Sequence, residues 1–514
     1  MKSDEFLMTK IIATIGPATE SFEQIYKLIE AGVRVFRINF SHGSFEDYDM
    51  RINNIRKAES ETGKFVGILG DLSGPKIRTG KVISGGVQLE KGMTIMFTKQ
   101  TVLGGSEGNE HTFSTTYPPF IDEVKTDEKI LLDDGNIELR CISKEGHGEK
   151  TILKCEVVEG NLLTSAKGIN LPESELSMPS MTEKDFLCLD YAIEKSLDYL
   201  ALSFVRSKDD VILLKNKMME RNARPAGLNV TSGDLGFSTD FDNNYIPIIS
   251  KIEKPQAIDN LEEIIAESDG IMVARGDLGV EMDLAEVALL QKKIINVCKQ
   301  QMKPVIVATQ MLESMIDSSV PTRAEVSDVA NAVMDGADAV MLSGETAIGK
   351  YPIKAVEMMV RVAKKTNFYQ VENSDPSLTI SPYKGFLRRK AAMARGVAMM
   401  AKDMKAKYIV TWLHSGGSSV FLSQQKMNIP IIACGENRRR LQQLSILYSI
   451  SPTCMKQPSS GSKFIAAVNE MMLTNGWAQV GDPVIIVASS PITKRGITNR
   501  VILHYLGEEV EEEN

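Results

Sequence analysis

Acidic and basic side chains follow two neighbouring apolar runs of the sequence. Lys251 and Glu253 come at the end of the run over residues 245–250, and Arg275 and Asp277 come after the run over residues 270–274. Two carboxylates with room between them suit a hard divalent cation such as Mg2+ or Mn2+, which takes water and substrate oxygens on its remaining positions. A lysine beside that cation suits an anionic group that gains or moves charge during a reaction. The alternative is that all four are ordinary solvated charges at strand ends.

The segment that connects the two runs must bring these side chains together. It is patterned as a helix and opens at Pro255, a residue favoured in the first turn. A strand, a helix and a second strand in this order form a βαβ unit, whose two strands are parallel. Because parallel strands end on the same side of a sheet, the sequence predicts that the four charged groups share one edge.

The same alternation of strand-like and helix-like runs extends along most of the chain. Strand-like runs at residues 10–15, 33–38 and 65–69 alternate with helix-like runs at 21–31 and 44–62, and the pattern resumes from residue 182 to residue 364. The total is eight strands, each followed by a helix, which favours a closed (β/α)8 TIM barrel over an open sheet. In such barrels the functional residues lie at the carboxyl ends of the strands.

Three segments depart from this alternation. Residues 76–175 consist of short alternating segments split by turn signals, and predict a small β-barrel lid domain inserted after the third strand. Beyond a linker rich in serine and proline at 368–384, a second alternation predicts a three-layer α/β domain. The polar segment 222–244 precedes the fifth strand, at the face where a structural role is expected. The predicted boundaries are 1–75 and 176–367 for the two parts of the barrel, 76–175 for the lid and 368–514 for the C-terminal domain.

Further polar residues follow other strands of the predicted barrel and would line the same pocket. They are Arg37, Asn39, Ser41, Asp71, Lys76, Arg78, Thr309, Ser343 and Glu345. Cations grouped around carboxylates fit a phosphorylated substrate bridged to Mg2+. Thr309 ends the seventh strand and could position a water that delivers a proton to a carbanion or enolate. His42 is the one histidine expected near this face, so histidine general-base chemistry is not favoured.

A glycine- and serine-rich loop in the predicted C-terminal domain is a second candidate site. It opens a helix, so its backbone N–H groups and hydroxyls could hold a phosphate. A plain helix cap is the alternative. The loop comprises Ser415, Gly416, Gly417, Ser418 and Ser419.

Composition excludes several classes of partner. The net charge of −8 gives no field that favours nucleic acid or an anionic membrane. The sequence has no apolar run of about 18 residues, so nothing is expected to span a membrane. The six cysteines are scattered, form no C-x-x-C pair and follow no secretory segment, which predicts reduced thiols in a cytoplasmic protein.

Long motifs in these same regions resemble the pyruvate kinase family. They are ATIGPAT (13–19), RINFSHG (37–43), GDLSGPKIRTG (70–80), ISKIE (249–253), IMVARGDLGVE (271–281), VATQMLESM (307–315) and PTRAEVSDVANAVMDGADAVMLSGETAIGKYP (321–352). The resemblance runs from Thr9 to about Gly507. It implies a barrel with an inserted β lid and a C-terminal α/β domain. The implied activity is Mg2+-dependent transfer of a phosphoryl group from phosphoenolpyruvate to ADP, which gives pyruvate and ATP in the last step of glycolysis.

The resemblance also implies a role for each matching residue. Glu253 and Asp277 would ligate the metal, and Lys251 would stabilise charge on the phosphoryl group and on the enolate. The family further implies a phosphorylated allosteric effector and a homotetramer. The remaining assignments are phosphate contacts by Arg37 and Arg78, a carboxylate site at Gly276, Asp277 and Thr309, a proton relay through Ser343 and Glu345, and a nucleotide site near Thr14, Pro17, His42, Arg78 and Lys167.

Departures from the family pattern carry further predictions. Many members hold K+ beside a glutamate, at a position where this chain has Lys76. An ammonium there could supply the positive charge itself, so we predict activity that does not need K+. The alternative is that Lys76 is exposed and the K+ site survives. The residues that match that site are Asn39, Ser41, Asp71 and, through its carbonyl, Leu72.

Two more departures concern the nucleotide and the effector. Ile348 stands where the family often has a lysine that contacts the nucleotide phosphate, and Lys350 follows two residues later. The loop at 415–419 matches the family's phosphate-binding loop, but residues 426–430 lack its usual Arg-Pro pair. We therefore expect a sugar-phosphate or nucleotide-monophosphate effector.

Two other functions stay open at this point. One is a Mg2+-dependent lyase or aldolase acting on the enolate of pyruvate, because related barrels place similar carboxylates around a metal. The lid and Lys251 argue against it. The other is a non-catalytic member of the family that binds metabolites, against which the intact Lys251, Glu253, Asp277 and Thr309 argue.

Overall fold

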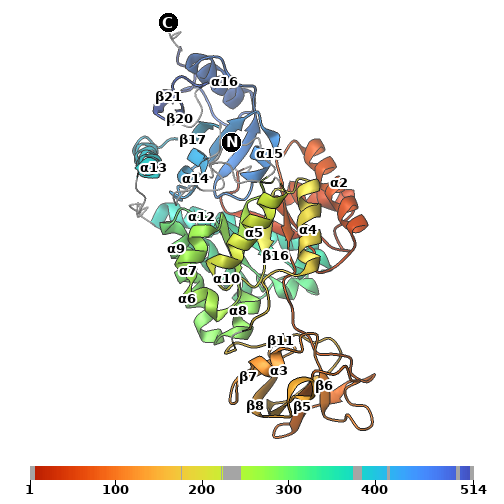
Figure 1. Ribbon diagram of the computed structural model, residues 1–514. Helices are drawn as coiled ribbons and strands as arrows, with labels where there is room; N and C mark the ends of the chain where they lie inside the picture. The colour runs from red at the N-terminus through yellow and green to blue at the C-terminus, as the bar shows by residue number, and fades with distance from the viewer. Residues whose placement is uncertain are drawn as a thin grey trace.

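Eight parallel strands close into a barrel at the centre of the molecule (Figure 1). The computed structural model describes residues 6–174, 176–221, 223, 245–373, 385–413, 417–493 and 498–509. The order around the barrel is β1-β16-β15-β14-β13-β12-β3-β2, which confirms the predicted fold class. The strands are β1 (Lys10–Thr14), β2 (Val33–Asn39), β3 (Gly67–Asp71), β12 (Tyr199–Leu202), β13 (Ile248–Ile252), β14 (Gly270–Ala274), β15 (Val305–Ala308) and β16 (Ala339–Leu342).

Helices cover the outer face of the barrel strands, and the inner face is buried inside the barrel. Strands β1, β3 and β14 are buried along their whole length, which is why they read as continuous apolar runs. Capping boxes at Ser44, Thr182, Ser207 and Thr322 fix where four of the helices begin. The helices are α1 (Phe22–Ala31), α2 (Phe45–Thr62), α4 (Glu183–Glu194), α5 (Lys208–Glu220), α6 (Pro255–Asp259), α7 (Leu261–Glu267), α8 (Arg275–Glu281), α9 (Leu284–Gln300), α10 (Arg323–Asp335), α11 (Gly344–Ala347) and α12 (Pro352–Asn373).

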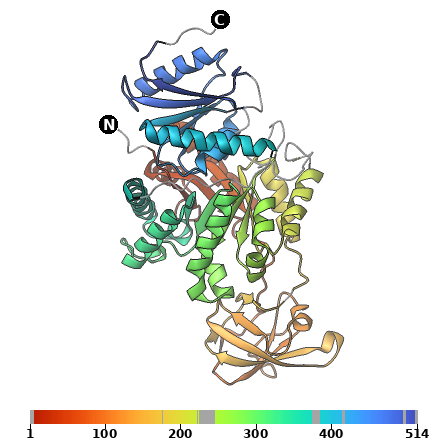
Figure 2. The ribbon, with the colours of Figure 1, turned by 90° about the vertical axis from the view of Figure 1, so that its left-hand side faces the viewer.

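A separate β domain follows β3 and lies at one end of the molecule; we call it the lid (Figure 2). Its core is built around Phe97, Phe113 and Phe120. A sheet with the order β11-β7-β8-β9-β5-β6 forms most of it, beside the pair β10-β4. The elements are β4 (Val87–Gln88), β5 (Thr94–Thr98), β6 (Thr112–Ser114), α3 (Phe120–Glu123), β7 (Lys129–Leu132), β8 (Ile137–Glu145), β9 (Ile152–Glu159), β10 (Leu162–Leu163) and β11 (Ile169–Asn170).

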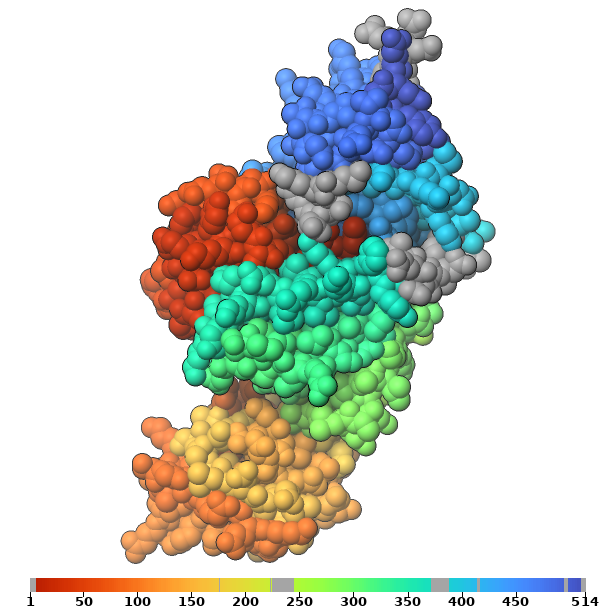
Figure 3. Space-filling model, turned by 180° about the vertical axis from the view of Figure 1, so that it is seen from behind, coloured from red at the N-terminus to blue at the C-terminus, as the bar shows by residue number. Residues whose placement is uncertain are grey.

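The C-terminal domain lies at the opposite end of the barrel from the lid (Figure 3). Its sheet has the order β19-β18-β17-β20-β21, in which only β21 is antiparallel to its neighbour among the described strands. The elements are α13 (Gly385–Asp403), β17 (Tyr408–Trp412), α14 (Gly417–Ser423), β18 (Ile431–Gly435), α15 (Arg438–Gln443), β19 (Ile450–Cys454), α16 (Gly461–Thr474), β20 (Pro483–Ala488) and β21 (Arg500–Tyr505).

The barrel and the C-terminal domain share one apolar core. One side chain or more from every barrel strand, such as Ile249 and Met272, belongs to the same buried cluster as Phe421 and Leu441 of the C-terminal domain. The Tyr199 hydroxyl of β12 donates a hydrogen bond to the Gln442 carbonyl at 3.2 Å. The lid has a separate apolar core of its own.

Several element boundaries differ from those that the sequence predicted. Strand β3 lies two residues later than expected, because its pairing with β2 sets Asn39 opposite Asp71. Helix α12 continues to Asn373, where a linker from residue 368 was predicted, because Phe368 and Tyr369 face solvent and break the apolar pattern without ending the helix. Strands β19 and β21, which the sequence did not reveal, are only half-buried and lack a strong pattern. The segment 222–244, apart from the buried Ala223, lies outside the described residues.

Candidate active site

A polar cavity of about 100 Å³ opens at the carboxyl ends of the barrel strands. Strands β13 and β14 pair with Lys251 opposite Met272, which places the residues that follow both strands on one side. The cavity therefore collects side chains that are far apart in the sequence. Its lining comprises Arg37, Asn39, Ser41, Asp71, Leu72, Ser73, Lys76, Ser203, Phe204, Lys251, Glu253 and Asp277.

Lys251 lies in β13 and its amine is held among carboxylates. Its Nζ is 2.7 Å from Glu253 Oε1 and 3.6 Å from Asp71 Oδ1, and it donates a hydrogen bond to Ser203 Oγ at 2.9 Å. Burial lowers the pKa of Lys251, but the attraction of Asp71, Glu253 and Asp277 outweighs burial and raises that pKa above its ordinary value. The ammonium is therefore charged at neutral pH, and Lys251 lines the polar cavity.

Glu253 and Asp277 are the two carboxylates expected to bind a metal. Glu253 is 1% exposed, and its Oε2 accepts a hydrogen bond from the Phe204 N–H at 2.8 Å. Burial raises the pKa of Glu253, with Lys251 opposing that rise. Asp277 lines the same cavity from the first turn of α8. The described residues contain no group of three or more His, Cys, Asp or Glu that could hold a metal ion. A pair of carboxylates nevertheless fits Mg2+, which binds through one or two carboxylates and completes its shell with substrate oxygens and water.

Arg37 of β2 forms hydrogen bonds to residues of two other barrel strands, β1 and β3. Its Nε donates a hydrogen bond to Asp71 Oδ2 at 2.6 Å, and a terminal nitrogen donates to Thr14 Oγ1 at 3.1 Å. Burial raises the pKa of Asp71, but Lys251 and Arg37 together lower it below its ordinary value. The guanidinium is thus held in place from β2 with 12% of its side chain exposed, which suits a fixed contact to an anion.

Thr309 follows β15 in a strained backbone conformation. Its φ is 66° and that of Gln310 is 51°, and a β-branched residue in this region costs about 1–3 kcal/mol. The Thr309 hydroxyl accepts a hydrogen bond from the Gly276 N–H at 2.7 Å and donates to the Ala308 carbonyl at 2.6 Å. A Cβ on Gly276 would lie 3.3 Å from that hydroxyl, so glycine allows the close approach. Strain held by the surrounding structure is common at functional sites.

Arg275 stabilises this strained segment and does not line the cavity. Its guanidinium donates to the carbonyls of Thr309 and Gln310 at 2.9 and 3.1 Å, and pairs with Asp328 on α10 at 2.6 Å. The sequence predicted that Arg275 shares one edge of the sheet with Lys251, Glu253 and Asp277. The structure differs because Arg275 begins α8, whose direction turns the side chain toward α10.

Ser343 and Glu345 lie close together after β16. Glu345 accepts hydrogen bonds from the N–H groups of Ser343 at 2.7 Å and Leu312 at 3.0 Å, and burial raises its pKa. The Ser343 hydroxyl is buried without a hydrogen-bond partner among the described residues. Neither residue lines the polar cavity.

The residues expected to hold a monovalent cation line the cavity together. Asn39 Oδ1 accepts from the Ser41 N–H at 3.1 Å, and the Leu72 carbonyl accepts from Ser203 Oγ at 2.7 Å. Lys76 lines the same cavity, with its Nζ 3.9 Å from Asp134 of the lid and 40% of its side chain exposed. The amine therefore lies at the edge of this group of residues.

The residues expected to bind the nucleotide come from the barrel and from the lid. On the lid, Arg78 donates to the Ala166 carbonyl at 2.9 Å and Lys167 pairs with Asp133 at 2.6 Å. On the barrel, Pro17 and His42 are exposed, and Thr14 contacts Arg37. None of these five residues lines the polar cavity.

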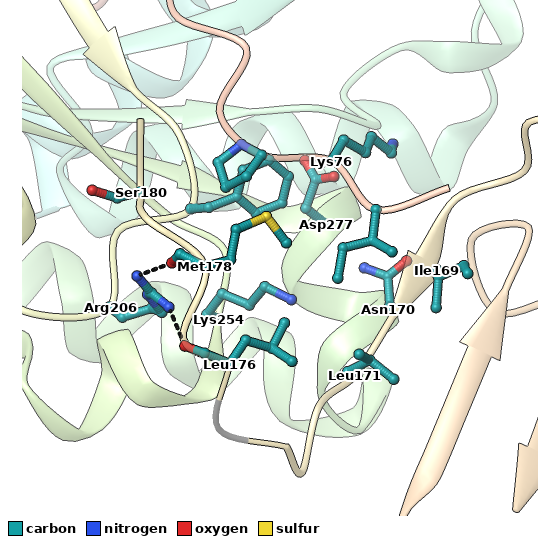
Figure 4. Close-up of a pocket in the computed structure, with 13 residues that line it drawn as sticks. Lys76, Ile169, Asn170, Leu171, Leu176, Met178, Ser180, Arg206, Lys254 and Asp277 are labelled. Carbon is teal, nitrogen blue, oxygen red and sulfur yellow. Dashed lines mark hydrogen bonds between the residues drawn. The ribbon is translucent and has the colours of Figure 1, made fainter. Parts of the chain in front are cut away.

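A second cavity, of about 50 Å³, lies where the lid joins the barrel (Figure 4). Arg206 closes one side of it by donating to the carbonyls of Leu176 and Met178, each at 2.9 Å. We call the two segments that join the lid to the barrel, near residues 75–77 and 169–180, the hinge. Lys76 and Asp277 line both cavities, so the hinge borders the polar site. Sequence reasoning missed Ser203 and Arg206; their position just after the fourth strand was the available signal.

The glycine- and serine-rich loop is described only in part. Ser415 and Gly416 lie outside the described residues, whereas Gly417, Ser418 and Ser419 begin α14. Ser418 Oγ forms a hydrogen bond with Thr498 Oγ1, and both line a cavity of about 10 Å³. The effector site stays a prediction. Among the described residues, no helix is long and apolar enough to cross a membrane.

Comparisons with known proteins give a consistent result over nearly the whole chain. The family model "Pyruvate kinase, barrel domain" matches residues 6–228 and 238–356, and "Pyruvate kinase, alpha/beta domain" matches residues 391–504. A pyruvate kinase of Corynebacterium glutamicum is 38% identical over 501 residues, covering 98% of each chain. One from Mycobacterium tuberculosis is 38% identical over 502 residues, covering 97% of this chain and 98% of its own. The crystal structure of a pyruvate kinase from Cryptosporidium parvum matches with a TM-score of 0.85 at 33% identity, covering 97% of this chain and 96% of that one.

Proposed function

The chain belongs to the pyruvate kinase family, and from that premise we propose which of its residues carry the reaction. It is a phosphotransferase that moves a phosphoryl group from phosphoenolpyruvate to ADP, giving pyruvate and ATP. The observation that carries our assignment is the convergence of Lys251, Glu253 and Asp277 on one cavity at the ends of β13 and β14.

Glu253 and Asp277 would hold the divalent cation, Mg2+ or Mn2+. The pair fits such an ion because both carboxylates line the cavity and leave positions for substrate oxygens. When bound, the cation neutralises charge on the phosphoryl oxygens. The N–H of Phe204 orients Glu253 by holding the oxygen that does not face Lys251.

Lys251 supplies positive charge where negative charge moves. Its ammonium is fixed by Ser203, Glu253 and Asp71 before the substrate arrives, so little reorganisation is needed during transfer. Phosphoryl transfer through a loose transition state depends on such positioning and electrostatic stabilisation. Arg37 would contact the phosphate from the β2 side of the same cavity.

Gly276 and Thr309 would hold the carboxylate of phosphoenolpyruvate. The hydroxyl of Thr309 accepts from the Gly276 N–H and donates to the Ala308 carbonyl, and this hydroxyl can rotate to donate to a substrate carboxylate instead. Thr309 would also place the proton donor that converts the enolate to pyruvate. Ser343 and Glu345 would form the relay behind it, which the raised pKa of the buried Glu345 supports.

The nucleotide would bind between barrel and lid. Arg78 and Lys167 would approach its phosphates from the lid, while Pro17 and His42 offer exposed surface on the barrel. Closure of the lid would exclude water, which otherwise competes with ADP for the phosphoryl group.

Activity without K+ is part of the proposal. Lys76 lines the cavity together with Asn39, Ser41, Asp71 and Leu72, so its ammonium can supply the charge that K+ provides elsewhere in the family. Pyruvate formation from phosphoenolpyruvate, ADP and Mg2+ should therefore proceed with tetramethylammonium as the monovalent cation. A Lys76→Glu variant should become dependent on K+. Strong K+ activation of the parent enzyme would contradict this part and leave the kinase assignment intact.

A phosphorylated effector and a homotetramer complete the proposal. The effector would be a sugar phosphate or a nucleoside monophosphate bound at residues 415–419, near Thr498. All six cysteines are free thiols, which supports a cytoplasmic location. Effector titration at subsaturating phosphoenolpyruvate and analytical ultracentrifugation test the two claims. No response to any phosphorylated metabolite would defeat the first, and a monomer would defeat the second.

A further inference from the structure

A buried carboxylate at the end of α8 lies beneath the hinge of the lid. Glu281 is the last residue of α8, and only 1% of its side chain is exposed. Asp277, a proposed metal ligand, lies one turn earlier in the same helix. A seven-residue helix therefore connects the metal end of the barrel to this second acidic group.

One oxygen of Glu281 contacts two different parts of the molecule. Its Oε1 accepts a hydrogen bond from Asn170 Nδ2 of the lid at 2.7 Å and forms an ion pair with Lys254 of the barrel. The other oxygen, Oε2, is buried without a hydrogen-bond partner among the described residues. In Figure 4 the side chains of Asn170 and Lys254 approach the same region from opposite sides of the hinge cavity.

The two partners of Glu281 belong to different parts of the molecule. Asn170 belongs to the lid, which would move during the reaction, and Lys254 belongs to the barrel, which would stay fixed. Asn170 ends β11, which is the last strand of the lid before the chain returns to the barrel. Lys254 directly follows Glu253, the other proposed metal ligand. Because a hydrogen bond of 2.7 Å is lost once its atoms separate by about 1 Å more, this contact is sensitive to the position of the lid.

We propose that Glu281 is a positioning residue that couples the placement of the lid to the metal-binding end of the barrel. When Asn170 is in place, Glu281 is held by the lid and by Lys254 together, and α8 and the end of β13 are fixed relative to each other. When the lid moves away, only the ion pair with Lys254 remains. This inference rests on the function proposed above, in which the lid closes over bound nucleotide.

A purely structural role for Glu281 makes a different prediction. In that case the carboxylate only neutralises the buried end of Lys254, and the hydrogen bond from Asn170 is incidental. Loss of the Asn170 amide would then change thermal stability slightly and leave the kinetic constants unchanged.

The test uses the full-length enzyme and the variants Asn170→Ala, Glu281→Gln and the double variant. We expect each single substitution to lower kcat/KM for ADP about tenfold with thermal unfolding of Asn170→Ala close to that of the parent. The double variant should lose no more than Glu281→Gln alone, because both remove the same link. The matched control is Asn109→Ala, which removes another lid amide, one that donates to Ser106 within a lid turn, and should stay within twofold of the parent.

A second measurement follows metal binding without turnover. Mn2+ binding, recorded by electron paramagnetic resonance with phosphoenolpyruvate present and no ADP, should weaken several-fold in Lys254→Met and recover in Lys254→Arg. The coupling would be overturned if kcat/KM for ADP were unchanged in Asn170→Ala. It would also be overturned if the loss in the double variant equalled the product of the losses in the two single variants. If the parent forms no pyruvate from phosphoenolpyruvate and ADP, the proposed function fails instead, which keeps the two failures distinct.

Discussion

Replacing Lys251 by methionine tests the centre of the proposed mechanism. Methionine keeps much of the side-chain volume but removes the charge that lies 2.7 Å from Glu253 and 3.6 Å from Asp71. At an effective dielectric constant of about 20, these two attractions amount to roughly 6 and roughly 5 kcal/mol before desolvation is counted. Breaking a buried pair by removing one partner costs about 3–5 kcal/mol, because it leaves an uncompensated charge.

The loss of stability should depend on pH in a defined direction. Burial already raises the pKa of Glu253, and removal of Lys251 takes away the main group that opposes this rise. A carboxyl whose pKa is higher in the folded state than in the unfolded state destabilises the fold. This cost is fully present at a pH above the folded-state pKa, and it disappears at a pH below the unfolded-state pKa. The deficit of Lys251→Met in the free energy of unfolding should therefore be largest at pH 8 and shrink as the pH falls toward 5.

The substitution should lower kcat by a much larger factor than its effect on the free energy of unfolding alone would suggest. A cation that stabilises the transferring phosphoryl group contributes about 10³–10⁵ to kcat in related chemistry, so Lys251→Met should lose on that order at saturating Mg2+. The assay is ADP-dependent pyruvate formation coupled to NADH oxidation, with urea denaturation of the same samples. Lys208→Met is the matched control, because that lysine pairs with Glu263 at the surface. The double variant Lys251→Met/Glu253→Gln should regain stability and stay inactive. Turnover of a folded Lys251→Met enzyme within tenfold of the parent would refute the reasoning.

Three more outcomes can be measured. Thr309→Val leaves the Gly276 N–H without an acceptor and should lower kcat about 10–100-fold, whereas Thr309→Ser keeps the hydroxyl and should stay near the parent; equal losses in both would contradict a role for that hydroxyl. Arg37→Lys cannot reach both Asp71 and Thr14 and should raise KM for phosphoenolpyruvate about tenfold, with an unchanged KM counting against the phosphate contact. Lys10 is buried, and burial, followed by the neighbouring Arg34, lowers its pKa to about 7. Lys10→Met should therefore relieve about 5 kcal/mol at pH 6. It also loses about 1 kcal/mol with the hydrogen bond that Lys10 donates to the Leu7 carbonyl at 2.7 Å, which leaves a net gain in the free energy of unfolding of about 4 kcal/mol. The gain should become smaller as the pH rises toward 10, and a gain that grows with pH would reverse the assigned sign.

The barrel was predictable because its strands are buried on both faces. Strand β14 was found with its exact ends, since apolar residues fill all its positions and charged residues follow at once. Lys251, Glu253 and Asp277 followed from the same reasoning, because parallel strands must end together. Contacts that depend on tertiary packing could not be predicted from the sequence. Arg275 pairs with Asp328 on another helix, and Asn170 donates to Glu281 across the hinge. Half-buried strands such as β19 carry too weak a pattern to be recognised.

The apolar core that runs from the barrel into the C-terminal domain limits how the molecule can be divided. Truncation before α13 would expose to water the apolar barrel residues that face the C-terminal domain, because Phe421 and Leu441 pack in the same core as these residues in the intact chain. The lid keeps its own core and could be excised with far less damage. Unfolding should accordingly proceed as two cooperative blocks, the lid by itself and the barrel together with its C-terminal neighbour.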